Sequence, residues 1–151
     1  MVRTMIHPNI LCVGYEPSLL EARSMILRQA GYVVHEIAIL ELALSKMESD
    51  SIDGVVMCHS IPRKQQEWFV TRIMHIRCLL PILCIKNHPF EQCVRGCTGV
   101  DGEPDSLLPA LAQAVGQYCV KNDRLSESTY RLDARIIEGI TADTDNRDGN
   151  Q

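Results

Sequence analysis

Residues 52–62 read Ile-Asp-Gly-Val-Val-Met-Cys-His-Ser-Ile-Pro, and this stretch decides the predicted fold. Its centre, Gly-Val-Val-Met-Cys, is a short apolar run of the kind found in strands buried on both faces of a parallel sheet. The polar residues His59 and Ser60 follow this run, and Pro62 then stands where a helix can begin. A buried strand that leads directly into a helix predicts a strand–helix–strand unit.

The same alternation extends in both directions along the chain. Further apolar runs predict strands at residues 10–13, 32–34, 81–85 and 98–100. Apolar residues at helical spacing predict four amphipathic helices, whose faces are Leu19, Ala22, Ile26, Leu27 and Ala30; Leu40, Ala43, Leu44 and Met47; Phe69, Ile73 and Ile76; and Leu107, Leu111, Ala114, Val115 and Tyr118. Residues 88–96 have only a weak helical pattern.

Short apolar strands that alternate with amphipathic helices predict an α/β fold, a flavodoxin-like doubly wound sheet of five parallel strands. The predicted domain covers residues 8–120, followed by a short C-terminal extension over 121–140 and a disordered tail over 141–151. The apolar residues between 126 and 140 fit a helix, but they also alternate as in a strand, and poor strand formers favour the helix. In this architecture function lies at the carboxyl ends of the strands.

Composition excludes several classes of function. The chain of 151 residues is 46% hydrophobic and 23% charged, and its net charge of −4 argues against a nucleic-acid surface. Its apolar run at residues 78–85 is too short to span a membrane, and residues 1–8 contain no signal-peptide pattern. We therefore expect a cytoplasmic protein without a cofactor, in which the seven cysteines are thiols.

Several framework motifs match those of a known family. The segments at residues 10–21, which contains Glu-Pro before an apolar helix, at 52–62 and at 81–85 occur in the order and spacing of a bacterial response-regulator receiver domain. Over about residues 8–120 the chain resembles this family. The resemblance implies two-component signalling and a site for phosphorylation on aspartate with Mg²⁺.

The residues that would perform this chemistry are absent. The family's acidic pair falls on Gly14 and Tyr15, and its phosphoacceptor aspartate falls on Cys58. Its Ser/Thr position falls on Lys86 and its lysine on Glu103. Together with Glu16, these residues make up what we call the vestigial phosphorylation pocket. One remaining carboxylate holds Mg²⁺ poorly, and a second acid in place of the lysine repels phosphate, so we expect neither a metal site nor enzymatic activity.

Two other uses of the pocket compete with this interpretation. Cys58 beside His59 suggests a thiol-based redox sensor or enzyme, although a buried and inert thiol is the more common situation. Phosphorylation on His59 or Ser60 is a further alternative. Zinc binding by Cys93 and Cys97 is not expected, because the spacing is loose and no fourth ligand is evident.

The sequence therefore predicts a phosphorylation-independent pseudo-receiver that acts through protein–protein contacts with other signalling proteins. Ile39, Leu40 and Trp68 are candidates for an exposed apolar patch, and their alternative is ordinary core packing. The segment at 126–140 is predicted to support a homodimer, and its candidate contact residues are Tyr130, Ile136 and Ile137.

Overall fold

The computed structural model describes residues 7–121. Five parallel strands form one sheet in the order β2-β1-β3-β4-β5. The strands are β1 (Asn9–Val13), β2 (Val33–Ile37), β3 (Gly54–Met57), β4 (Ile82–Ile85) and β5 (Thr98–Val100). This order is that of the flavodoxin-like fold, so the predicted fold class is confirmed.

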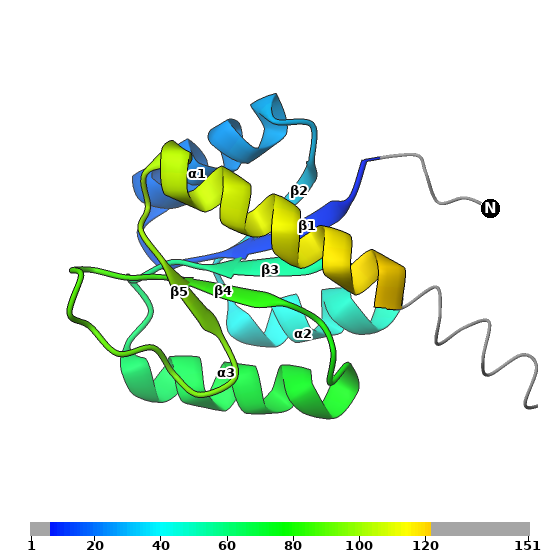
Figure 1. Ribbon diagram of the computed structural model, residues 1–151. Coiled ribbons are helices and arrows are strands. Elements are labelled where there is room, and N and C mark those ends of the chain that lie inside the picture. The colour runs from blue at the N-terminus through cyan, green and yellow to red at the C-terminus, as the bar shows by residue number, and fades with distance from the viewer. Residues whose placement is uncertain (1–6, 122–151) are drawn as a thin grey trace, which may run out of the picture. The chain divides into compact units, whose positions relative to one another are not determined.

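Helices cover both faces of the sheet. They are α1 (Pro17–Gln29), α2 (Leu40–Ser49), α3 (Arg63–Ile76) and a helix at residues 104–121. Figure 1 shows α1 and this last helix on one face and α2 and α3 on the other. Residues 86–97, between β4 and β5, form turns and no helix, which agrees with their weak helical pattern.

No helix within residues 7–121 is long and apolar enough for a membrane span. The expected extension over 121–140 and tail over 141–151, with Tyr130, Ile136 and Ile137, lie outside the described residues apart from residue 121, which is helical.

The two central strands explain the buried core. Every residue of β3 and all of β1 except Asn9 are buried, because helices cover these strands on both sides. On the α1 face, a Cβ at Gly54 would lie 3.1 Å from Cγ2 of Val115 and 3.3 Å from Cδ1 of Ile10. Gly54 therefore lets the last helix pack closely on the sheet.

The buried face of α1 differs from the predicted one. The buried residues are Leu20, Ser24 and Leu27, whereas Ala22 and Ala30 are exposed. The predicted face was rotated from the observed one because it was drawn through apolar residues alone, whereas the observed face includes the polar Ser24. Its hydroxyl oxygen is buried without a hydrogen-bond partner among the described residues.

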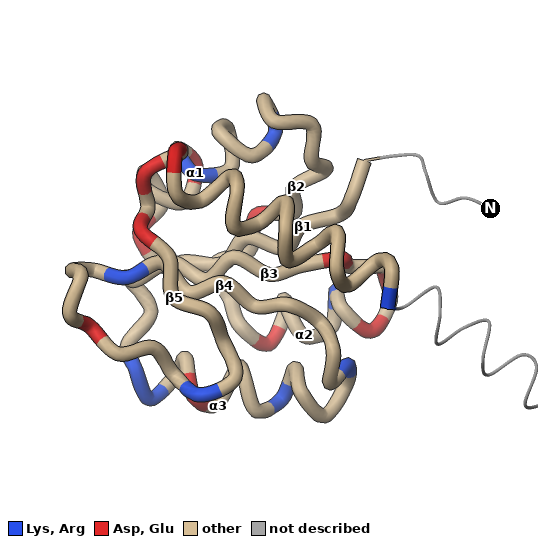
Figure 2. The backbone as a smooth tube through the Cα atoms, in the orientation of Figure 1, with Lys and Arg blue, Asp and Glu red and all other residues tan. Residues whose placement is uncertain are grey.

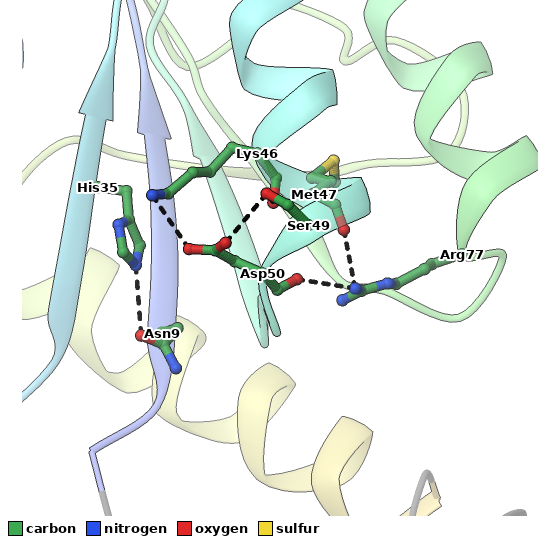
Figure 3. A network of polar contacts seen from close by, with 7 residues as sticks. All are labelled: Asn9, His35, Lys46, Met47, Ser49, Asp50 and Arg77. Atoms are coloured by element: carbon green, nitrogen blue, oxygen red, sulfur yellow. Dashed lines mark hydrogen bonds and ion pairs between the residues drawn. The ribbon is translucent and has the colours of Figure 1, made fainter.

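The carboxyl end of α2 is held by one arginine. The guanidinium of Arg77, just after α3, donates hydrogen bonds to the backbone carbonyl oxygens of Met47 at 2.8 Å, Asp50 at 2.9 Å and Ile52 at 3.0 Å. Figure 3 shows Arg77 at the backbone carbonyl of Asp50, whereas the Asp50 carboxylate points away and pairs with Lys46 at 3.0 Å. The last carbonyls of a helix have no partner within the helix, so Arg77 supplies what α2 lacks.

We predict that Arg77→Ala lowers the free energy of unfolding by about 2–3 kcal/mol, because it leaves three half-buried carbonyl oxygens without a charged donor. Urea denaturation would measure the change. Arg72→Ala is the matched control, since Arg72 lies on α3 shortly before Arg77 and stacks over the Trp68 ring at 5.3 Å. Its expected loss is below about 1 kcal/mol. Equal losses for the two variants would contradict the role assigned to Arg77.

Candidate functional site

The carboxyl ends of β1 and β3 bring two of the predicted pocket residues into contact. The backbone N–H of Cys58 donates to the Val13 carbonyl at 2.9 Å, which continues the β1–β3 ladder to the end of the strands. A Cβ added to Gly14 would lie 2.9 Å from Cβ and 3.1 Å from Sγ of Cys58. The Cys58 side chain therefore fills the space beside Gly14. Any residue larger than glycine at position 14 would require the two strand ends to shift.

Cys58 is fully buried and has a second thiol beside it. A hydrogen bond from the buried Cys12 thiol lowers the pKa of Cys58 to about 7, against the effect of burial and with help from the positive charge of Arg23. The same contact and burial raise the pKa of Cys12. The thiol of Cys58 is thus chemically activated but enclosed, whereas reactive cysteines are usually activated and partly exposed.

Arg23 is a pocket residue that the sequence interpretation missed. It projects from α1, and a Cβ at Gly102 would lie 3.2 Å from its Cζ, so the guanidinium packs on the loop that follows β5. Its Nη1 atom is buried without a hydrogen-bond partner among the described residues. The signal was present in the spacing, because Leu20, Arg23 and Leu27 recur at helical intervals. Arg23 places a positive charge close to Cys58.

The loop after β1 is tied to the residues that follow β3 and to α3. Its Tyr15 N–H donates to the Ser60 hydroxyl at 2.8 Å, and the Tyr15 hydroxyl donates to Oε1 of Gln65 on α3. The Glu16 carboxylate turns away to cap α1, accepting from the backbone N–H of Ser18 at 3.2 Å and from its hydroxyl at 2.9 Å. These bonds lower the pKa of Glu16. The only carboxylate expected at a metal site is therefore engaged as a helix cap.

Lys86 and Glu103 complete the predicted set at the ends of β4 and β5. The Lys86 ammonium donates to the carbonyl of Pro89 at 3.3 Å, within its own loop. Glu103 is exposed, between Asp101 and Asp105. Figure 2 shows acidic residues in succession along the loop from β5 into the last helix. The exposed carboxylates of this loop disfavour a phosphoryl group close to them.

Metal-binding geometry is not found at this end of the sheet. Within the part of the chain that the structure describes, no group of three or more His, Cys, Asp or Glu residues could hold a metal ion.

The candidate interaction residues differ in exposure. Ile39 is 53% exposed and Trp68 is 37% exposed, so both are accessible to a partner. Leu40 is only 4% exposed and belongs to the core, which fits the alternative considered for it and removes it from the patch. Phe90, in the loop between β4 and β5, is 90% exposed and was not among the predicted residues.

The comparisons with known proteins find structural matches but no sequence matches. No family model matches the chain, and no curated protein sequence matches it. Among solved structures, a signal receiver domain of an HD domain-containing protein from Pseudomonas fluorescens superposes with a TM-score of 0.68 at 18% identity, covering 82% of this chain and 98% of that one.

Other receiver structures give the same result. The chemotaxis response regulator CheY4 of Vibrio cholerae superposes with a TM-score of 0.60 at 23% identity, covering 72% of this chain and 99% of the regulator. A histidine kinase–response regulator complex, ThkA with TrrA, contains a chain that matches with a TM-score of 0.61 at 18% identity, covering 71% of this chain and 97% of that one. The chain described here therefore has the CheY-like, flavodoxin-like fold of receiver domains.

Proposed function

We propose that this chain is a phosphorylation-independent pseudo-receiver that works as a protein–protein interaction module in signal transduction. The observation that carries the proposal is the contact between Cys58 and Gly14. By the family resemblance Cys58 stands in place of the phosphoacceptor aspartate, and it packs so closely on the end of β1 that a Cβ at Gly14 would lie 2.9 Å from its own Cβ. A thiol cannot form the acyl phosphate that an aspartate forms, and a carboxylate at position 14 would clash with it.

The surrounding charges support the same proposal. Phosphoryl transfer needs a metal ion to neutralise the charge of the transferring group. Glu16, the remaining acid, caps α1, and the nearby cation Arg23 disfavours a divalent metal. The acidic run at residues 101–105 lies where the family has its lysine. The alternative acceptor Ser60 has its oxygen engaged by the Tyr15 N–H at 2.8 Å.

Other signalling proteins are the proposed partners. A receiver of similar fold occurs in a complex with a histidine kinase, which supports a partner of this class. Two accessible apolar side chains, Ile39 just before α2 and Trp68 on α3, offer contact area that requires no phosphorylation.

We predict that acetyl phosphate with Mg²⁺ leaves the protein unmodified. Intact mass spectrometry should show no phosphate adduct, and the fluorescence of Trp68, the single tryptophan, should not respond to Mg²⁺. Fluoroberyllate, which mimics a phosphoryl group, should not bind. A stable adduct would contradict the proposal, and its loss in Ser60→Ala or His59→Asn would identify an alternative acceptor.

A thiol sensor or enzyme based on Cys58 is the second candidate function. The observation that favours it is the pKa of about 7, which makes a large thiolate fraction available at neutral pH. The observation against it is the complete burial of the side chain.

We predict that burial dominates in a labelling experiment. Iodoacetamide at neutral pH should alkylate Cys58 no faster than the buried Cys12 and Cys84, and more slowly than the exposed Cys78. Peptide mapping over time would measure each rate. Selective alkylation of Cys58 would favour the sensor over the pseudo-receiver.

We also predict a homodimer supported by residues 126–140. This prediction comes from the apolar side chains of that segment, since an isolated helix of this length is marginal in water unless it packs on something. Light scattering across concentrations should give the mass of a dimer for the full chain and of a monomer after truncation following Val120. A full-length monomer at high micromolar concentration would refute dimerisation, and two equally dimeric proteins would refute the role of the segment.

A further inference from the structure

Three cysteines that the proposed function does not use meet on the α3 face of the sheet. Cys84 lies on β4 and is buried, while Cys93 and Cys97 belong to the loop that leads to β5 and pack against the same core. Cys84 is paired with Gly99 across the β4–β5 ladder. A Cβ at Gly99 would overlap Sγ of Cys93. The Cys93 thiol therefore occupies the space that a side chain at position 99 would fill.

The Cys84 thiol is held in a defined orientation. Its Sγ donates to Oε1 of Gln66 on α3 at 3.7 Å. Gln66 is itself only 5% exposed, and its amide nitrogen donates to the carbonyl of Ile61 at 2.8 Å. A buried glutamine side chain that is fixed at one end and accepts from a thiol at the other positions that thiol.

Cys97 is the cluster's most easily ionised thiol. Its Sγ lies 3.1 Å from the Val94 carbonyl oxygen. Contact with the Cys84 thiol lowers the pKa of Cys97 from its usual range, and the positive charge of Arg63 adds to this effect against the opposing effect of burial. Contact with Cys97 and burial raise the pKa of Cys84, and burial raises that of Cys93. Cys84 therefore interacts with both loop thiols and acts as the centre of the cluster.

We propose that this cluster is a thiol-oxidation site, at which a hydroperoxide forms a disulfide between Cys84 on β4 and a cysteine of the β4–β5 loop. The loop makes this feasible, because residues 86–97 form turns and a small backbone adjustment there breaks no helical hydrogen bonds. The bond would tie the loop covalently to the sheet. The site lies on the opposite face from Cys12 and Cys58 and is independent of the vestigial pocket.

The chemistry balances in two steps. The Cys97 thiolate attacks one oxygen of the hydroperoxide, the O–O bond breaks, and the leaving alkoxide or hydroxide takes a proton, which leaves a sulfenic acid on Cys97. The Cys84 sulfur then attacks Sγ of Cys97, the S–S bond forms, the S–O bond breaks, and water leaves with the Cys84 proton. Two thiols lose two electrons and two protons, and the peroxide is reduced to water and an alcohol, or to two waters. The Cys93 sulfur can then attack Sγ of Cys84, which forms a Cys84–Cys93 bond, breaks the Cys84–Cys97 bond and releases Cys97 as a thiol without further oxidation.

The test treats the full chain with hydrogen peroxide, blocks the remaining thiols and maps disulfide-linked peptides. The wild-type chain should lose two free thiols, and its oligomeric state should stay the same because the bond forms within one chain. The disulfide-linked peptide should contain Cys84. Dithiothreitol should reverse the change. Cys84→Ser and the double variant Cys93→Ser with Cys97→Ser should each abolish the intramolecular bond, and the double variant tests the proposal even if the core substitution impairs folding.

Cys78→Ser is the matched control, because Cys78 is exposed and lies outside the cluster. It should leave disulfide formation unchanged. Each single loop variant, Cys93→Ser or Cys97→Ser, should still form a bond to Cys84, with slower oxidation when Cys97 is absent. A Cys93–Cys97 bond, a bond among the cluster cysteines that persists in Cys84→Ser, or no bond to Cys84 in the wild type would overturn the proposal, whereas a separate Cys12–Cys58 bond belongs to the other face and is scored apart.

Discussion

Burial of β1 and β3 on both faces is the constraint on which the rest of this structure depends. Parallel strands covered by helices on each side have no edge or face at which a polar side chain meets water, so polar groups collect where the strands end. The hydrogen bond from Cys58 to Val13 carries this ladder to its last residue, and the loops after β1, β3, β4 and β5 begin beyond it. The position of the pocket is thus a consequence of strand packing, whatever chemistry the loops contain.

Much of the fold could be predicted because its signals are local. Apolar runs located each strand, and the predicted β5 at residues 98–100 matches the observed strand in both bounds. The buried face of α1 was wrong because Leu20, Arg23, Ser24 and Leu27 share one face at helical spacing, and two of these four residues are polar. A pattern of apolar residues cannot identify a polar residue that is buried.

The sequence predicted where the candidate site lies better than it predicted the roles of its side chains. The chain places Gly14 against Cys58 as expected from two strand ends that lie side by side, and this follows from topology alone. The roles of Glu16, Lys86 and Arg23 depend on side-chain direction, which no spacing specifies. Glu16 caps a helix, Lys86 bonds within its own loop, and Arg23 approaches Cys58 from α1. The three-thiol cluster was also missed, because Cys84 and Cys93 meet through the β4–β5 pairing.

The contact between Gly14 and Cys58 also limits the introduction of aspartates at these positions. A Cβ at position 14 would lie 2.9 Å from the Cβ of Cys58, an atom that every residue except glycine has. An acid at position 14 therefore requires the strand ends to shift, even when position 58 holds an aspartate. An aspartate at position 58 would be a buried charge, with the positive charge of Arg23 to offset part of its cost. Each substitution is therefore expected to be unfavourable, and neither removes the obstacle to the other, so the present pair of residues is difficult to leave by single steps.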